Sequence, residues 1–400
     1  MLIAYKTEIH PTEKQKAIIK QTIGVTRATK NQYIAHVSEV YQNGGSFVSA
    51  IDYSKWLNNT YLPTHPEKSW VKEVYAKAVK QGLMNTQNAF QRFFKGLGKY
   101  PKFKKKNRQD VSFYFVKNDA KHIIACQRHR IKIPTLSWVK LKEKGYIPSH
   151  SETSVIKSGT ISIKANRYYV SVLVEVPDTY KKTLPNKENE GVGYDLGIKD
   201  TAIGSNKLVY KNINKSGRIR KLEKKLKRQQ RQLSRKYESE KLRIKNKEIT
   251  KGDATRKNID KQVLKVQKLH QQLTNIREDF QNKMVHDMAK TKPAYITIED
   301  LNIKGMMKNK HLSKAIAQQK LHGLKTKLIS KANQGYFELR QVDRFYPSSK
   351  LCNHCGNKKI DLKLSDRTYE CEKCGYQEDR DFNASLNLKD ATKYIVLAPA

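Results

Sequence analysis

The chain has 400 residues, a length that favours two or three domains over one. Its 80 Lys and Arg residues outnumber 37 Asp and Glu residues, and the formal net charge of +43 favours a polyanionic partner such as nucleic acid. The sequence has no run of about 18 apolar residues, which excludes a membrane-spanning helix, and its 21 Tyr and 11 Phe residues argue against general disorder.

Strand and helix patterns alternate in the N-terminal half. Residues 2–9 predict a strand, and apolar residues at helical spacing predict a helical bundle over 12–95. Period-two alternation predicts strands from 111 to 177, and a polar linker follows over 178–190. We expect the first strand to pair with the later ones, which makes the helical bundle an insertion into an all-β region.

A mixed pattern of strands and helices begins at Gly191. The helix expected over 215–247 is strongly basic, with 15 Lys or Arg residues against three acidic ones, and it carries an apolar stripe. A second long helix follows it, so we expect the two to form an antiparallel hairpin. The predicted elements are a strand, turn and strand over 191–204, helices over 215–247 and 258–290, a strand over 294–301, a helix over 312–333, a strand over 336–343 and a last helix from Asn383.

Four of the five cysteines form two pairs at metal-ligand spacing. Cys352 and Cys355 make the first CxxC pair, Cys371 and Cys374 make the second, and fifteen residues separate the pairs. This spacing is typical of a structural Zn²⁺ site with four thiolate ligands, which leaves no open position for catalysis. A redox site needs only one CxxC pair, and disulfides need an oxidising compartment, so both alternatives are less favoured. His354 lies inside the first pair and is expected to be a bystander.

Three acidic residues stand where catalytic groups gather in α/β proteins. Asp195 ends one predicted strand, Glu299 ends another, and Asp381 precedes the last predicted helix. Active groups lie at the carboxyl ends of strands in such sheets, and three converging carboxylates can hold two Mg²⁺ ions for phosphodiester hydrolysis. The residues alone leave structural roles open: a turn for Asp195, a solvated strand end for Glu299 and the N-cap of the last helix for Asp381.

Several segments together resemble one known family. The segments are IGVTRATKNQYI (23–34), PKFKKK (101–106), YDLGIKDTAI (194–203), ITIEDL (296–301), RFYPSSKLCNHCG (344–356) and CEKCGYQEDRDFNASLNL (371–388). In these runs the sequence is similar to the TnpB family, the transposon-encoded RNA-guided DNA nucleases related to type V CRISPR effectors. The resemblance covers nearly the whole chain and is most specific in the C-terminal motifs.

The resemblance implies an α+β multidomain protein with an RNase H-like RuvC nuclease domain. It implies that Asp195, Glu299 and Asp381 form the catalytic, Mg²⁺-binding triad; Asp379 is the near competitor of Asp381 but lies outside the D-x-N-A pattern. The implied domains are a β-barrel wedge domain over 1–10 and 110–180, a helical recognition domain over 11–109, the RuvC domain over 188–345 and 375–400, and a zinc ribbon over 346–374.

The resemblance also implies nucleic-acid partners, namely a guide RNA derived from the transposon end and double-stranded target DNA cut beside a short adjacent motif. The basic segments 99–108, 215–247 and 305–325 could line the channel that holds a guide–target heteroduplex. For any single Lys a solvated surface position is the alternative, and for Tyr53 the alternative is packing inside the helical bundle. The candidate nucleic-acid contacts are Tyr53, Lys77, Lys80, Gln81, Lys102, Lys104 and Lys105.

The predicted function is RNA-guided cleavage of DNA, with one structural Zn²⁺ and two catalytic Mg²⁺ ions as cofactors. Three alternatives stay open: a type V-like CRISPR-associated effector, an RNA-guided DNA-binding repressor that does not cleave, and a DNA transposase that acts without RNA. The first residues show no secretory signal. We therefore expect the protein in the cytoplasm of a bacterial or archaeal cell, associated with the nucleoid.

Overall fold

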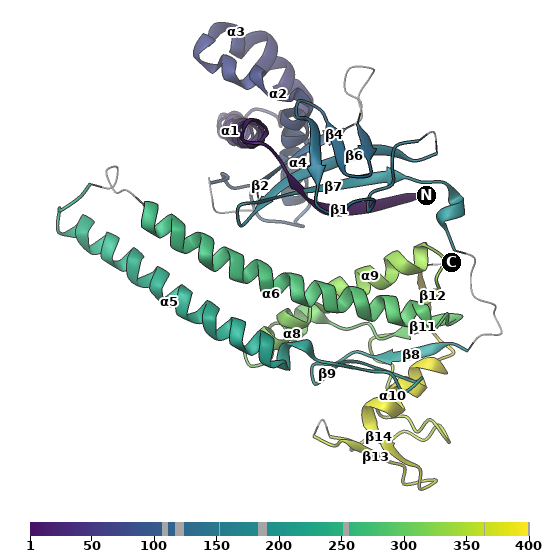
Figure 1. Ribbon diagram of the computed structural model, residues 1–400. Coiled ribbons are helices and arrows are strands. Elements are labelled where there is room, and N and C mark those ends of the chain that lie inside the picture. Colours follow the sequence, from purple (N-terminus) through teal and green to yellow (C-terminus); the bar gives the residue numbers. More distant parts are fainter. Residues whose placement is uncertain are drawn as a thin grey trace. The chain divides into compact units, whose positions relative to one another are not determined.

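The computed structural model is a mixed α+β structure with two compact units, Met1–Asp178 (unit 1) and Thr179–Ala400 (unit 2) (Figure 1). The boundary falls in the expected polar linker, of which residues 183–189 lie outside the described part of the chain. No helix among the described residues is long and apolar enough to cross a membrane. The structure describes residues 1–105, 111–116, 124–151, 153–182, 190–250, 256–363 and 365–398.

Unit 1 is built on one antiparallel sheet of seven strands in the order β2-β6-β7-β1-β5-β4-β3. The first strand pairs with β7 along most of its length and with β5 at its end, which confirms the expected pairing. Closure of this sheet into a barrel remains a prediction. The strands are β1 (Leu2–His10), β2 (Val111–Val116), β3 (Ala125–Gln127), β4 (Arg130–Ile133), β5 (Ser137–Leu141), β6 (Val155–Lys164) and β7 (Arg167–Glu175).

Four α-helices, together with a π-helical segment (Leu57–Tyr61) and a 3-10 segment (Pro66–Glu73), lie between β1 and β2 in the described residues, as the sequence predicts. Thr12 begins the first of them through a capping box with Gln15, in which each side chain accepts a hydrogen bond from the other residue's backbone N–H. Ile19 of this helix and Ala78 of the last one are fully buried in the same core as the sheet residues. The helices are α1 (Glu13–Gln42), α2 (Ala50–Trp56), α3 (Leu62–Thr64) and α4 (Ala76–Phe94).

Unit 2 contains a mixed six-stranded sheet in the order β10-β9-β8-β11-β12-β15. Strands β8, β11 and β12 run parallel to one another, while β9, β10 and β15 are antiparallel to their neighbours. The short edge strands β10 and β15 are absent from the sequence-based prediction. The strands are β8 (Val192–Asp195), β9 (Asp200–Gly204), β10 (Val209–Lys211), β11 (Tyr295–Ile298), β12 (Glu338–Gln341) and β15 (Ile395–Ala398).

The two long helices between β10 and β11 form the expected hairpin (Figure 1). Their seam buries Ile219 and Leu226 of the first helix against Val266, Leu269 and Leu273 of the second. Because the apolar stripe is used in this seam, the basic face of the first helix is left to solvent. The helices of unit 2 are α5 (Gly217–Lys245), α6 (Lys257–Lys290), α7 (Ile303–Met306), α8 (Ser313–Gln319), α9 (Leu321–Asn333) and α10 (Arg380–Lys389).

The prediction of a single helix over 312–333 is wrong, because the helix is interrupted at Lys320. This residue has a left-handed backbone with φ of 52° and separates α8 from α9. The side-chain amide of Gln281 donates to the carbonyl oxygens of Gln319 (2.8 Å) and Lys320 (3.2 Å), so the carbonyls at the break remain paired. A buried partner on α6 thus stabilises a break that the apolar pattern of the segment does not reveal.

Helices cover both faces of the sheet of unit 2 (Figure 1). Helices α6 and α9 pack on one face around Met288 and Leu324, and α10 packs on the other. The approach of α10 to β8 is close, because a Cβ atom added at Gly193 would lie 2.1 Å from the carbonyl oxygen of Ser385 and 2.4 Å from the backbone nitrogen of Lys389. Only glycine at position 193 allows this packing.

We expect Gly193→Ala to lower the free energy of unfolding by at least about 2 kcal/mol, because its neighbours are backbone atoms that cannot rotate away. Gly217→Ala is the control, since a Cβ atom there meets nothing within 4 Å; its effect should stay within about 0.5 kcal/mol. Chemical denaturation of both variants measures the difference. Equal stabilities would contradict the close approach of α10 to β8.

Candidate active site and metal centre

Two of the predicted acidic residues lie side by side at one edge of the sheet. Strands β8 and β11 are parallel neighbours, with Tyr194 opposite Ile298. Asp195 and Glu299 are the next residues on these strands, so both are carried to the carboxyl edge in matching register. Neighbouring strands are about 4.8 Å apart. The fold therefore places these two carboxylates next to each other, as the sequence pattern predicts.

The third acidic residue reaches this edge from the first turn of α10. The N-cap of this helix is Asp379, whose side chain accepts hydrogen bonds from the backbone N–H groups of Asp381 and Phe382, both at 3.0 Å. The N-cap role that the residues alone left open for Asp381 is therefore wrong. The helix also starts at Arg380, three residues earlier than expected, and the Asp381 carboxylate is left available for other interactions.

Asp195 lies in an electrostatic environment that opposes its ionisation. Its pKa is raised to about 8, mainly by burial and in addition by the nearby negative charges of Glu299 and Asp381. Burial also raises the pKa of Glu299, although a hydrogen bond from the Ser348 hydroxyl acts in the opposite direction. Asp195 thus interacts electrostatically with both of the other acidic residues.

Arg380 supplies most of the local compensation. Its guanidinium donates from Nε (3.1 Å) and Nη2 (2.9 Å) to Oδ1 of Asp381, and both side chains are largely buried. Arg367 lies farther away, 3.9 Å from the other carboxylate oxygen. Neither these arginines nor Ser348 is among the sequence-based candidates. Ser348 lies in the RFYPSSK segment and Arg380 beside Asp381, but no spacing rule indicates their contacts.

The raised pKa of Asp195 makes the stability of the folded protein depend on pH. Between about pH 4 and pH 8 the folded protein binds more protons at Asp195 than the unfolded chain does, so the free energy of unfolding falls as the pH rises through this window. We expect Asp195→Asn to stabilise the protein at pH 8 without added divalent cation, on the order of a few kcal/mol. The gain should shrink at pH 5. Thermal unfolding at both pH values measures it, and a pH-independent difference would contradict this electrostatic origin.

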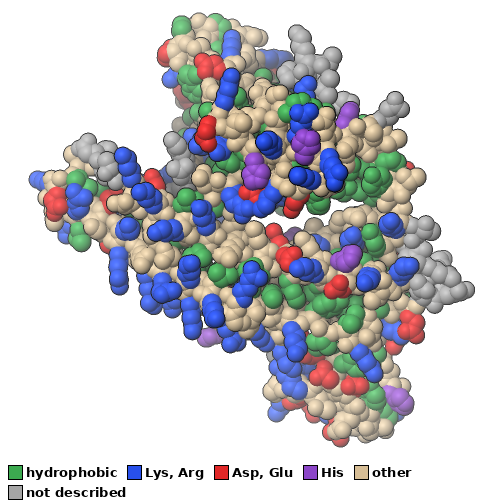
Figure 2. All heavy atoms as spheres, in the orientation of Figure 1, with side chains coloured by type: hydrophobic (Ala, Val, Ile, Leu, Met, Phe, Trp, Pro, Cys, Tyr) green, Lys and Arg blue, Asp and Glu red, His purple; other side chains and the backbone are tan. Residues whose placement is uncertain are grey.

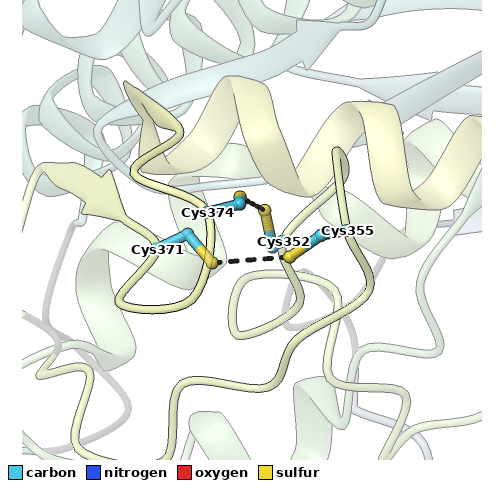
Figure 3. Close-up of side chains that lie close together, drawn as sticks. All are labelled: Cys352, Cys355, Cys371 and Cys374. Atoms are coloured by element: carbon cyan, nitrogen blue, oxygen red, sulfur yellow. Dashed lines mark hydrogen bonds between the residues drawn. The ribbon is translucent and has the colours of Figure 1, made fainter.

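The four predicted zinc ligands converge in the C-terminal part of unit 2. Their sulfur atoms all lie within 4.8 Å of one another. Figure 3 shows them facing a common centre, with sulfur–sulfur distances of 3.7 Å between Cys352 and Cys374 and 3.6 Å between Cys355 and Cys371. In the described parts of the chain, this is the one group of three or more His, Cys, Asp or Glu side chains whose possible ligand atoms lie this close together; Asp195, Glu299 and Asp381 do not form such a group.

Two similar turns bring the sulfur atoms together. Gly356 and Gly375, with φ of +71° and +70°, follow the two pairs and donate their backbone N–H groups to the carbonyl oxygens of Cys352 and Cys371. Burial opposes ionisation of Cys371, but hydrogen bonds from the backbone N–H groups of Lys373 and Cys374 and from the neighbouring thiols of Cys374 and Cys355 lower its pKa to about 6. This Cys₄ cluster could hold a metal ion such as Zn²⁺, since thiolates in a tetrahedral set suit that ion.

We expect one Zn²⁺ per chain, and Cys371→Ser should lower the zinc content and the melting temperature together, because structural zinc contributes directly to folding. Cys126→Ser is the matched control: Cys126 is also buried but lies in β3, outside the cluster. Elemental analysis and thermal unfolding of both variants provide the measurement. Full zinc content in Cys371→Ser, or a zinc loss shared by the control, would refute the assignment.

The candidate nucleic-acid contacts of unit 1 differ in exposure. Lys77 and Lys80 are exposed on α4, and Gln81 is partly buried on the same helix and donates to Asn85 Oδ1 at 3.0 Å. Tyr53, in contrast, is completely buried in α2, and burial raises its pKa. In this conformation Tyr53 packs inside the helical bundle, as its structural alternative predicted.

The basic segment after α4 is held against α1. Asn31 donates to the carbonyl oxygen of Lys104 at 3.0 Å and accepts from its backbone N–H at 2.8 Å, and the hydroxyl groups of Ser38 and Tyr100 are 2.6 Å apart. Side chains along this segment stay exposed, Lys102, Lys104 and Lys105 among them. Residues 106–108 of the predicted basic run lie outside the described residues.

Three family models match successive parts of the chain. "Helix-turn-helix domain" matches residues 1–46, which here form β1 and the single helix α1. "Probable transposase" matches residues 171–310, and "Cas12f1-like, TNB domain" matches residues 322–388, a range that includes the Cys₄ cluster. These parts of the chain are thus similar to a transposase family and to a domain of Cas12f1-like proteins.

Curated relatives extend this similarity over nearly the full length. The Escherichia coli K12 protein "Putative RNA-guided DNA endonuclease InsQ" is 28% identical over 99% of this chain and 94% of its own length. A "Putative RNA-guided DNA endonuclease" of Streptomyces pristinaespiralis is also 28% identical, over 96% and 88%. Over nearly its whole length the chain is therefore similar to RNA-guided DNA endonucleases, and over a shorter stretch to proteins named TnpB-like.

A solved structure shares the fold. The chain matches a structure titled "Cryo-EM structure of the Cas12f1-sgRNA-target DNA complex" with a TM-score of 0.58 and 12% identity, over 99% of each chain. At this identity the match concerns the fold only.

Proposed function

We propose that the protein is an RNA-guided, Mg²⁺-dependent DNA endonuclease with Asp195, Glu299 and Asp381 as its catalytic triad. One observation carries the proposal: Asp195 ends β8 beside Glu299 at the end of β11, and the negative charges of Glu299 and Asp381 both contribute to the raised pKa of Asp195. The names of its full-length relatives as RNA-guided DNA endonucleases support the activity.

The topology of unit 2 supports an RNase H-like RuvC domain. Its first three strands form an antiparallel meander, and the next two join parallel to the first, which puts β8 at the centre of the sheet beside β11. We propose the RuvC boundaries 188–345 and 375–400 around a zinc ribbon at 346–374, with the wedge and recognition domains in unit 1.

The donor chemistry of the acidic site fits Mg²⁺, because carboxylate oxygens are the protein ligands that this ion prefers. Two bound Mg²⁺ ions would activate the attacking water and stabilise the leaving oxygen of the phosphodiester. The residues of the chain prepare the site for such cations: Asp195 holds a proton in their absence, Ser348 orients Glu299, and Arg380 neutralises Asp381. Binding of a cation at Asp381 therefore competes with Arg380.

The α5–α6 hairpin and the basic segment of unit 1 are proposed to bind the guide RNA and the target DNA. Figure 2 shows Lys and Arg side chains gathered along the hairpin. Its apolar residues are buried between α5 and α6. A backbone-directed basic surface suits a heteroduplex whose sequence is read by base pairing. We further propose that Lys77, Lys80 and Gln81 contact the target-adjacent motif, because the two exposed Lys side chains and the partly buried Gln81 lie on one helix, and Lys and Gln can bind base edges.

The triad is tested by comparing two neighbouring acidic residues with different predicted roles. We expect Asp381→Ala to abolish cleavage of a guide-matched DNA duplex in Mg²⁺ while RNA and DNA binding persist, because a cation ligand is lost. Asp379→Ala removes the N-cap instead and should lower stability by about 1 kcal/mol, with cleavage kept at moderate temperature. Cleavage and binding are measured in the same buffer with protein purified together with its RNA.

The two variants separate the possible outcomes. Near-normal cleavage by Asp381→Ala together with loss of cleavage in Asp379→Ala would transfer the catalytic role to Asp379. Normal cleavage by both variants would overturn the assignment of the active site to this edge of the sheet. Absence of a defined copurified RNA would argue for a transposase that acts without a guide.

A further inference from the structure

Phe345 is the most exposed large apolar side chain in the described part of the chain, with 86% of its surface accessible. Single exposed apolar side chains are common on protein surfaces, so exposure by itself indicates little. What distinguishes Phe345 is its position: it lies in the short connection between β12 and the first cysteine pair, residues 343–348, which we call the 343–348 turn.

Backbone hydrogen bonds hold the shape of this turn. The carboxylate of Asp343 accepts from the N–H of Phe345 at 2.8 Å, and the carbonyl oxygen of Asp343 accepts from the N–H of Tyr346 at 3.1 Å. Just before the turn, the N–H of Val342 donates to the carbonyl oxygen of Ile298 at 3.1 Å, which fixes the start of the turn to β11. Phe345 therefore projects from a backbone that is paired on both sides.

The side chains on either side of Phe345 contact the acidic edge of the sheet. Arg344 donates from Nη2 to Oδ2 of Asp300 at 2.7 Å, and the Ser348 hydroxyl donates to Glu299. These two carboxylates are consecutive residues at the end of β11. The backbone that carries Phe345 is thus anchored on both sides to the residues that follow β11, Glu299 among them.

The turn is also fixed to the helix that carries Asp381. The Tyr346 hydroxyl donates to the carbonyl oxygen of Asn387 at 3.0 Å, and the side-chain amide of Asn387 donates to the carbonyl oxygen of Ser348 at 2.7 Å. Both contacts are made by α10. A ligand bound at Phe345 would consequently lie close to the segments that carry Glu299 and Asp381.

The charged residues near Phe345 in the chain indicate the class of ligand. Arg344 precedes Phe345 and pairs with Asp300, and Lys325 of α9 lies 3.9 Å from the same carboxylate. Lys350 follows the turn and donates to the carbonyl oxygen of Ile360. An exposed aromatic ring flanked by cations is the combination that binds single-stranded nucleic acid, where bases stack on the ring and phosphates pair with the cations. A base inside a duplex offers no free face, so the strand has to be unpaired at this point.

We propose that Phe345 stacks on a base of the unpaired DNA strand and so determines which phosphodiester is presented to Asp195, Glu299 and Asp381. This inference rests on the nuclease function proposed above. Phe345 touches the substrate away from the reacting atoms, and its role is positioning. Small displacements of the reacting group cost large factors in rate, so a fixed stacking surface next to the site has a direct effect on cleavage.

The experiment compares three substitutions in the complete protein–RNA complex. Phe345→Ala and Phe345→Leu remove the aromatic face, and Phe345→Trp restores it. With a guide-matched duplex in Mg²⁺, we expect the first two to lower the single-turnover cleavage rate about tenfold or more, in line with the loss of one stacked base. They should also spread the cuts over neighbouring phosphodiesters, while Phe345→Trp keeps the wild-type rate and cut position. The cut distribution is read at single-nucleotide resolution.

A matched control separates this role from a general surface effect. Ile360 is 79% exposed in the same unit and lies outside the turn, so Ile360→Ala should leave rate and cut position unchanged. A binding measurement in the Asp381→Ala background covers the case in which cleavage is too slow to follow. There, the fluorescence of a 2-aminopurine base beside the cut position should be quenched with Phe345 and recover with Phe345→Leu.

The outcomes distinguish this inference from the function on which it rests. Cleavage by the wild-type complex with an unchanged rate and cut position in Phe345→Ala would overturn the inference and leave the nuclease assignment intact. Wild-type behaviour of Phe345→Leu would show that apolar contact without stacking suffices, which also overturns it. Failure of the wild-type complex to cleave would overturn the nuclease function and this inference together.

Discussion

The parallel pairing of β8 with β11 is the constraint on which the rest of unit 2 depends. Its register puts Tyr194 opposite Ile298 and therefore brings Asp195 and Glu299 to the same edge as neighbours. Two carboxylates in this position repel each other, and burial increases the cost of ionising them, as the raised pKa of Asp195 shows. The surrounding structure therefore has to stabilise two paired strands although the carboxylates at their ends repel each other.

Several contacts offset this repulsion in the protein itself. Close packing of α10 at Gly193 brings Asp381 to the same edge together with its partner Arg380. The hydroxyl of Ser348 stabilises the charged form of Glu299. Stability and the proposed function oppose each other here, because a site that recruits cations has to retain negative charge that lowers the stability of the cation-free protein.

The Cys₄ cluster is structurally coupled to the acidic site through α10. Side-chain amides of Asn383 and Asn387 both donate to the carbonyl oxygen of Leu351, at 2.7 and 2.8 Å, and Leu351 immediately precedes the first cysteine. The same Asn387 contacts Tyr346 and Ser348 of the 343–348 turn, just after Phe345. A metal ion bound by the cysteines would therefore stabilise the segment that positions α10, in addition to its own two turns.

The sequence by itself determined the features that depend on local pattern. The long helices α5 and α6 follow their predicted ranges within a few residues, because a continuous apolar stripe fixes both the helix and its buried face. The convergence of the four cysteines follows from two short CxxC turns. Asp195 and Glu299 were correctly placed at strand ends, since the strands before them are apolar and buried.

Only the tertiary structure decided the features that depend on distant partners. The edge strands β10 and β15 have three and four residues, too few for a periodic signal, and they form because a neighbouring strand offers hydrogen bonds. The break at Lys320 exists because Gln281 on another helix pairs its carbonyl groups. The contacts of Arg380 and Ser348, and the anchoring of the turn that carries Phe345, likewise arise from segments that folding brings together. Contacts between residues far apart in the chain leave no spacing to read, so no local pattern could have indicated them.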